Sequence, residues 1–285
     1  MADVRPTATV KPVTSVQAKR SNNSISWLAP LLCIVAGYLI WRFGLGAASN
    51  FTKPGSGGFW PSHEGPTSAL AKMYEGGIIV PILIGCLLTV LVFVVERFLT
   101  IAKAAGTASN ADFIRKVQYH LANKNVDAAL AECDKQKGSV GNVMKAGLHR
   151  YKDMINNNEL STDQKVMAIQ KEVEEATSLE LPMLEKNLVF LSTLASVATL
   201  IGLLGTVVGM IRSFSALGEG SGGSGAANSL SQGISEALYN TALGIGTSAL
   251  AIVFYNIFTT KIDGITYGID ESGFTLTQSF ASLYK

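Results

Sequence analysis

The sequence predicts an all-α integral membrane protein with four transmembrane helices and a helical domain between the second and the third. Three observations support this fold class. Of the 285 residues, 48% are hydrophobic and only 15% are charged, which is typical of membrane proteins. Three long stretches carry no charge over the roughly 20 residues that a helix needs to cross a bilayer. The basic residues gather on one side of these stretches, as a fixed orientation in the membrane requires.

Residues 1–26 are predicted to be a cytoplasmic tail and residues 27–43 the first transmembrane helix. Trp27 and Trp41 flank this apolar run, and tryptophan commonly anchors a span at the two membrane interfaces. A cleaved signal peptide is the alternative, because small residues follow the run, and it would leave three spans. The long segment before the run and Arg42 after it favour an uncleaved anchor.

The remaining segments are assigned from hydropathy and from the basic residues beside the spans, which stay cytoplasmic when loops are short. The segment after the second apolar run is rich in lysine and arginine, whereas residues 213–235 contain none. The predicted order is a periplasmic loop at 44–75, a second span at 76–99, a helical cytoplasmic domain at 100–186, a third span at 187–211, a periplasmic Gly-rich loop at 212–235, a fourth span at 236–260 and a cytoplasmic tail at 261–285.

The two outer loops are predicted to lack regular structure. The first contains KPGSGGFWPSHEGP, whose proline, glycine and serine residues are typical of an irregular connector. The second contains GEGSGGSGAAN at residues 218–228, which lacks the Gly-Lys-Ser/Thr of a phosphate-binding loop. This second stretch therefore predicts a flexible linker.

The cytoplasmic domain carries three local signals. Ser161 and Gln164 have the spacing of a helix capping box. Lys171 and Glu175 are one helical turn apart and predict an exposed ion pair. Pro182 predicts a kink or a helix start at the membrane surface.

The composition argues against several classes of function. A net charge of +2, from 23 basic and 21 acidic residues, leaves no basic surface for nucleic acid. The three cysteines and three histidines are scattered along the chain, so neither a metal site nor another cofactor is expected. We expect no enzymatic activity, because no pairing of a nucleophile with a base is visible.

Small and hydroxyl-bearing residues form a stripe on each of the last two spans, because residues three and four apart share one helix face. One interpretation is tight helix packing, with each hydroxyl bonded to its own backbone. The other is that Thr206 and Thr241 line a cavity that holds water or another helix. The candidate pore-lining residues are Thr199, Thr206, Thr241 and Ser248, and the candidate packing residues are Gly202, Gly205, Gly209 and Gly244.

The uncharged parts of the last two spans contain no Asp, Glu, Lys, Arg or His, although an ion path through hydrocarbon usually contains such a group. A proton-carrying carboxylate would therefore come from a partner protein. Glu236, at the outer end of the fourth span, is the acid nearest to the path. The alternative is that Glu236 only begins the helix, where the helix dipole stabilises a negative charge.

Two long motifs resemble the MotA/TolQ/ExbB proton-channel family, and most closely its ExbB/TolQ branch. They are LEKNLVFLSTLASVATLIGLLGTVVGMIRSF and ISEALYNTALGIGTSALAIVFYN, and ERF at residues 96–98 is similar to the motif at the inner end of the preceding span. In this resemblance Thr206 and Thr241 match the pore threonines, and Glu236 matches the acid that begins the last span. The chain departs from the family where Thr199 and Leu250 replace prolines, and in its additional first span.

The resemblance implies a multi-pass protein of the bacterial inner membrane that assembles as a ring of copies, usually five, in contact with membrane lipids. The ring would surround the membrane helix of an ExbD/TolR-like protein, whose aspartate carries the proton, and would energise a TonB/TolA-like protein for outer-membrane transport. A stator of a rotary or gliding motor is the nearby alternative. A passive scaffold, in which the small residues only pack helices, is the alternative from another class.

Overall fold

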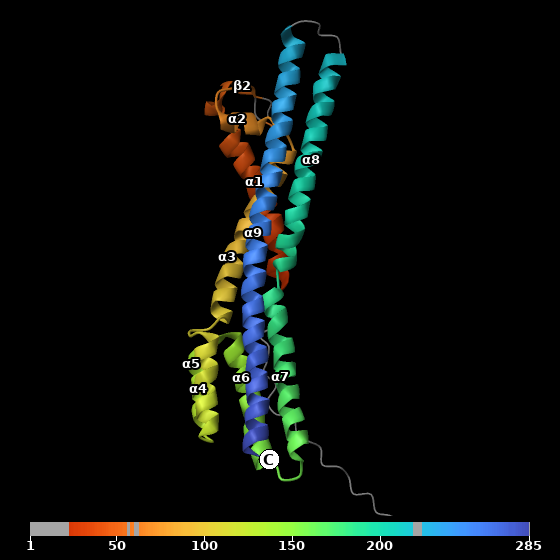
Figure 1. The fold of residues 1–285 in the computed structure, drawn as a ribbon. Helices are drawn as coiled ribbons and strands as arrows, with labels where there is room; N and C mark the ends of the chain where they lie inside the picture. The colour runs from red at the N-terminus through yellow and green to blue at the C-terminus, as the bar shows by residue number, and fades with distance from the viewer. Residues whose placement is uncertain (1–22, 56–57, 60–62, 219–223, 285) are drawn as a thin grey trace, which may run out of the picture.

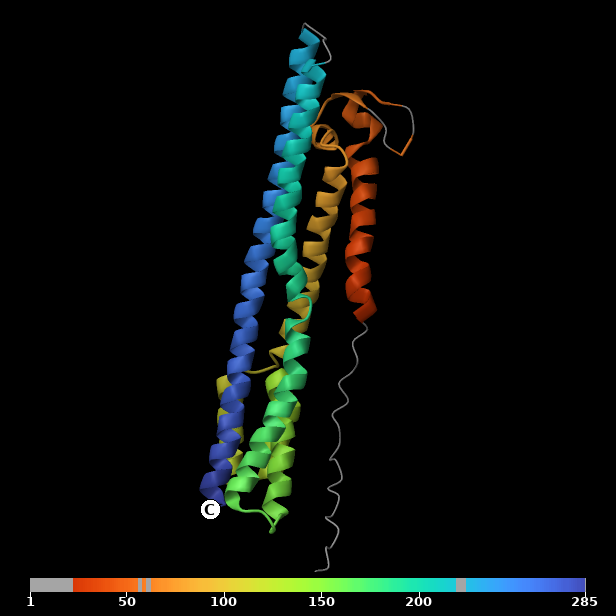
Figure 2. The same cartoon turned by 90° about the vertical axis from the view of Figure 1, so that its right-hand side faces the viewer.

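The structure is a computed structural model that describes residues 23–55, 58–59, 63–218 and 224–284. It is an elongated molecule whose long helices run close to one common direction (Figure 1 and Figure 2). The described part contains four helical stretches that are long and apolar enough to cross a membrane. This confirms the predicted, mainly helical fold with four helices able to span a bilayer. Most of the predicted first tail and residues 219–223 of the predicted linker lie outside the described residues. The rest of the predicted Gly-rich loop at 212–235 is helical, because one helix extends to Gly218 and the next begins at Ser224.

The elements follow one another without a large sheet. In chain order they are α1 (Asn23–Leu39), η1 (Ile40–Leu45), η2 (Ala48–Asn50), β1 (Phe51–Lys53), β2 (Glu64–Pro66), α2 (Ala69–Tyr74), α3 (Ile79–Ala104), α4 (Asn110–Ala122), α5 (Val126–Gln136), α6 (Gly138–Asn156), α7 (Thr162–Glu185), α8 (Leu188–Gly218) and α9 (Ser224–Leu283). Here η1 is a short π-helix and η2 is a short 3-10 helix.

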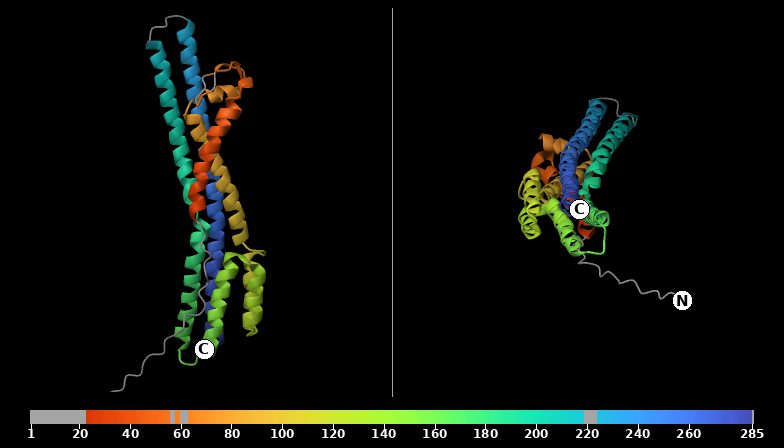
Figure 3. Two further views of the ribbon diagram at one scale, coloured as in Figure 1. Left: turned by 180° about the vertical axis from the view of Figure 1, so that it is seen from behind. Right: turned by 60° about the horizontal axis from the view of Figure 1, so that its bottom comes forward.

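Helix α9 is the central element of the molecule. Its 60 residues correspond to a length of about 90 Å at the usual rise of an α-helix. One half packs against α8, and the other half packs against α6 and α7 (Figure 1, Figure 3). The segment predicted as a C-terminal tail thus continues the helix of the fourth span. The reason is visible in the buried apolar residues Ile262, Ile265, Ile269 and Leu276, which recur at helical spacing.

Helices α4 to α7 and the second half of α9 form a bundle with one apolar core, which we call the distal bundle. Two local predictions are confirmed here. The capping box of Ser161 and Gln164 begins α7. The Nζ atom of Lys171 lies 3.7 Å from a carboxylate oxygen of Glu175, and both side chains are exposed.

A buried arginine joins α3 to the break between α7 and α8. Arg97 is 2% exposed, and its Nη1 atom donates hydrogen bonds to the carbonyl oxygens of Met183 (3.3 Å) and Leu184 (3.2 Å). Arg97 also contacts the carboxylate of Glu96, which accepts a hydrogen bond from Asn187 Nδ2 at 3.1 Å. These contacts connect α3 to the end of α7 and the start of α8.

The structure does not begin a helix at Pro182, and the alternative of a kink there stays a prediction. Helix α7 continues through Pro182 to Glu185, and α8 begins at Leu188. The break lies at Asn187, whose φ of 67° is in the left-handed region. Arg97 donates to the carbonyl groups of Met183 and Leu184 at the end of α7, which have no partner within the helix.

The first outer loop is more regular than its composition predicts. Strands β1 and β2 pair antiparallel, with Phe51 opposite Pro66. Trp41 is 2% exposed and stacks on Tyr74 with ring centroids 4.3 Å apart. Phe51 stacks on His63 at 4.5 Å. These aromatic contacts join short segments that are distant in the sequence. The spacing of apolar residues along the chain does not predict contacts of this kind.

Helix α1 lies beside α3 (Figure 2). The two backbones meet at Gly37, where an added Cβ would lie 2.6 Å from the carbonyl oxygen of Pro81 and 2.7 Å from the nitrogen of Gly85. Most of the large apolar side chains on the other faces of α1 are exposed, including Leu31 and Leu32. Helix α1 is therefore a peripheral helix that α3 attaches to the α8–α9 pair.

Candidate functional site along helices α8 and α9

Helices α8 and α9 are in backbone contact along a row of glycines, which we call the α8–α9 seam. A Cβ added to Gly244 would lie 2.6 Å from the carbonyl oxygen of Ala198, and one added to Gly202 would lie 3.0 Å from that of Asn240. Gly205 and Gly209 are equally close to side chains of α9. Close backbone approach of this kind is how membrane helices associate, because lipid offers no hydrophobic force between them.

Two hydroxyl groups of α9 join the helices across the seam. Ser248 donates a hydrogen bond to the carbonyl oxygen of Ala195, and Thr241 donates one to that of Gly202 at 3.2 Å. Ser248 is buried, whereas Thr241 is half-buried. Both hydroxyl protons are thus used within the chain, and each oxygen keeps lone pairs that can accept a further hydrogen bond.

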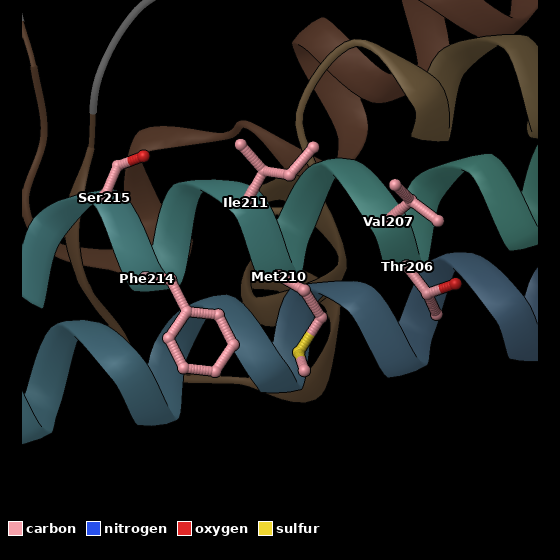
Figure 4. Close-up of a pocket in the computed structure, with 6 residues that line it drawn as sticks. All are labelled: Thr206, Val207, Met210, Ile211, Phe214 and Ser215. Carbon is pink, nitrogen blue, oxygen red and sulfur yellow. The ribbon is translucent and has the colours of Figure 1, made fainter.

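Thr206 lies on a different face of α8. Its Oγ1 atom donates to the carbonyl oxygen of Leu203 at 2.6 Å, and its side chain lines an open groove. The groove is otherwise mainly apolar and includes Val207, Met210, Ile211, Phe214 and Ser215. Thr206, Met210 and Phe214 form one row of side chains, and Val207, Ile211 and Ser215 form the other (Figure 4).

The structure does not gather the predicted path residues around one cavity of a single chain. Thr206 lines the groove on α8, whereas Thr241 and Ser248 lie in the seam. Thr199 is half-buried on α8, two turns before Thr206. A role for these residues in one path therefore stays a prediction, and it requires further helices to complete the walls.

Glu236 lines a separate, narrow cavity between the start of α3, α8 and α9. Arg212 and Asn240 line the same cavity, and neither was singled out as a site residue from the sequence. Asn240 is 2% exposed and its Nδ2 atom donates to the carbonyl oxygen of Gly76 at 3.2 Å. The sequence did contain a signal for Asn240. An asparagine within an otherwise apolar run needs a polar partner, so it marks a candidate site residue.

The described residues hold no group of three or more histidine, cysteine or acidic side chains placed to bind a metal ion. The chemistry available along α8 and α9 is therefore that of hydroxyls, backbone carbonyls and one cluster of charged side chains at the Glu236 end. These groups can accept and donate hydrogen bonds within an apolar, membrane-spanning frame.

The fold and the seam define a multi-pass membrane protein whose last two long helices pack through small residues. Comparison with known proteins points to one family. Residues 135–271 match the model of the MotA/TolQ/ExbB proton channel family, a region that contains α8 and most of α9. This match, over just under half of the chain, and the relatives named ExbB-like and TolQ support this family, near its ExbB/TolQ branch.

Three relatives support this assignment. A biopolymer transport protein described as ExbB-like from Synechocystis sp. is 40% identical over 86 residues, which cover 30% of this chain and 41% of the relative. The Tol-Pal system protein TolQ of Haemophilus influenzae is 39% identical over 104 residues, covering 34% and 43%. The TolQ protein of Pseudomonas aeruginosa is 28% identical over 179 residues, covering 57% and 77%. The chain thus spans less than half the length of the first two.

Proposed function

We propose that this chain is the proton-channel subunit of a complex in the bacterial inner membrane that uses the proton motive force to energise a TonB-like protein for outer-membrane transport. The family and the ExbB-like and TolQ relatives support a proton-channel-type subunit of an energising complex. In this proposal the distal bundle lies in the cytoplasm, and the hairpin of β1 and β2 lies in the periplasm.

The observation that carries the proposal is the contrast between hydroxyls and charges along α8 and α9. Residues 188–211 and 237–260 contain hydroxyl groups but no Asp, Glu, Lys, Arg or His. A path through these residues of this chain alone would offer no carboxylate that takes up and releases a proton. A partner must therefore supply the carboxylate, and we propose a single-span ExbD/TolR-like protein with an aspartate in its membrane helix.

We propose further that several copies of this chain, five in the simplest ring, surround the partner helix. The groove on α8 supports this arrangement, because Val207, Ile211 and Phe214 are 55%, 60% and 59% exposed. These side chains and Thr206 would face the partner helix, while the seam keeps each α8–α9 pair rigid. The mechanical work obtained from proton flow would energise a TonB/TolA-like protein.

The hydrogen bonding of Thr206 suggests how the chain distinguishes the two states of the partner's carboxyl group. Because its proton is donated to Leu203, Thr206 Oγ1 presents only lone pairs to the groove. Lone pairs accept a hydrogen bond from a protonated carboxyl group and repel an ionised one. The neutral form can therefore pass the apolar groove, and each proton that crosses releases about 2.3 kcal/mol per 100 mV.

The test is proton uptake by liposomes that contain the complex with an ExbD/TolR-like partner. We expect Thr206→Val to abolish uptake while the complex still forms, because valine keeps the shape and removes the acceptor. The matched control is Thr193→Val, since Thr193 also lies on α8 and bonds its own backbone, at Val189, but lies outside the groove. Equal uptake by both variants would contradict the proposal and favour a passive scaffold.

A further inference from the structure

Asn240 on α9 is a deeply buried amide of which one atom is unpaired. It is 2% exposed, and its Nδ2 atom donates a hydrogen bond to the carbonyl oxygen of Gly76 at 3.2 Å. Its Oδ1 atom has no hydrogen-bond donor in the described part of the chain. Nearly all buried polar groups in folded proteins are paired with protein or with ordered water, because an unpaired one costs free energy. Asn240 Oδ1 therefore indicates a donor that the chain itself does not supply.

A narrow cavity lies beside this side chain. Asn240 lines it together with Glu236, one turn earlier on the same helix, and Gly76 and Val208 belong to the same lining. The Oδ1 atom of Asn240 lies close to Gly76, since a Cβ added to that glycine would be 3.0 Å from it. The space open to the centre of a water molecule is about 10 Å³, which is close to the minimum that one water needs. The cavity thus has room for one water and for no larger ligand.

The spacing of Glu236 and Asn240 suits a bridge by one water molecule. Residues four apart on a helix share one face, and their Cβ atoms lie about 5–6 Å apart. A water that donates to both side chains spans such a separation, because each of its hydrogen bonds joins oxygen atoms about 2.7–2.8 Å apart. The amide oxygen and the ionised carboxylate only accept hydrogen bonds. The two hydrogens of one water therefore match the two acceptors of the cavity.

We propose that this cavity binds one water molecule, which donates one hydrogen bond to Asn240 Oδ1 and the other to the carboxylate of Glu236. The water pairs the open acceptor of Asn240 and connects Glu236 to the interior of the protein. Arg212 also lines the cavity, but its side chain is exposed, so solvent hydrates its charge and the site does not need it. Asn240 is then a positioning residue for Glu236. That role rests on the proposed function, whereas the water site itself does not.

The water site is tested by solid-state NMR of the full chain in lipid, with isotopically labelled asparagine and threonine. The measurement is the transfer of magnetisation from water protons to side-chain carbons, and Asn240→Leu identifies the Asn240 signal. We expect rapid transfer to Asn240 Cγ. Thr247 is the internal control, because it is also 2% exposed on α9 with an unpaired hydroxyl but does not line the cavity. No transfer to Asn240 Cγ, or equal transfer to Thr247 Cβ, would overturn the inference.

Val208→Ile tests the cavity without changing either acceptor. Val208 is half-buried and lines the cavity, so the added methyl group takes the space of the water. We expect transfer to Asn240 Cγ to fall to the level of Thr247 in this variant. The matched control is Val253→Ile on α9, because Val253 is 54% exposed and does not line the cavity. Equal transfer to Asn240 Cγ in both isoleucine variants would contradict a water bound in this cavity.

The positioning role of Asn240 is tested separately, by proton uptake of liposomes that contain the complex with an ExbD/TolR-like partner. We expect Val208→Ile to slow uptake relative to Val253→Ile, because the carboxylate of Glu236 loses the water that holds it. Equal uptake by the two variants would overturn the positioning role. Absence of uptake by the wild-type complex would contradict the proposed function and this role with it, while the NMR result would still decide whether the water is bound.

Discussion

Replacing Arg97 tests how the buried arginine positions α8. We consider Arg97→Met, which keeps most of the volume of the side chain and removes its charge and its donors. The carbonyl groups of Met183 and Leu184 lose their donor, and Glu96 loses its ion pair with Arg97 but keeps the hydrogen bond from Asn187. Each buried acceptor left unpaired costs about 1–3 kcal/mol. The carboxylate of Glu96 adds less than a fully buried charge would, because its side chain is 40% exposed.

We therefore expect Arg97→Met to lower the free energy of unfolding by about 2–4 kcal/mol. In a chain of this length that corresponds to a fall in Tm of about 5–15 °C. The assay is thermal unfolding of the purified chain in detergent, followed by circular dichroism. The control is Arg115→Met, because Arg115 is 76% exposed and its nearest carboxylate oxygen, on Asp112, is 3.7 Å away.

The control should change the free energy of unfolding by no more than about 0.5 kcal/mol, as is usual for exposed ion pairs. If Arg97→Met and Arg115→Met have the same Tm, the hydrogen bonds of Arg97 do not stabilise the start of α8. The account of the break between α7 and α8 would then be wrong.

Three further changes test other parts of the structure. Gly244→Ala should destabilise the chain by about 1–3 kcal/mol through overpacking of the seam. The control is Gly246→Ala, which should be neutral or stabilising because an added Cβ there has no neighbour within 4 Å. Equal Tm values for the two variants would contradict the close backbone contact of α8 and α9 at Gly244. Ser161→Ala should cost about 1 kcal/mol by removing the cap of α7, measured against Ser282→Ala, which has no capping role. Burial raises the pKa of Cys133 to about 12, so the folded chain should resist alkylation by a thiol reagent at pH 8 and become reactive only on unfolding. The folded chain holds the thiol proton of Cys133 to a higher pH than the unfolded chain does. The stability that this thiol contributes should therefore be complete below the pKa of the thiol in the unfolded chain and be lost as the pH rises toward 12. A Cys133→Ala variant with the same alkaline unfolding profile as the wild type would contradict this.

The spans could be predicted from the sequence because hydropathy and charge are local properties. The uncharged runs gave the helices that now include α3, α8 and α9, and the glycine stripe identified the faces that meet in the seam. The helical spacing of apolar residues also indicates a buried helix face outside the predicted spans. Ile265 and Leu276 continue the buried face of α9 far beyond the fourth predicted span.

The contacts that could not be predicted join residues that are distant along the chain. Arg97 is 86 residues away from Met183, and Asn240 is 164 away from Gly76. A charged residue at the end of a span has the same sequence pattern whether it is solvated or fully buried, so Arg97 gave no signal of its role. The pairing of β1 with β2 was missed because each strand has only three residues.

The central claim is that this chain forms the wall of a proton path and a partner supplies the titrating group. The most direct measurement compares proton uptake by liposomes that contain the chain alone, the chain with an ExbD/TolR-like partner, and the chain with a partner whose membrane aspartate is asparagine. The account predicts uptake only in the second case, with equal amounts of assembled complex in the second and third. Uptake by the chain alone, or by the complex with asparagine, would contradict it.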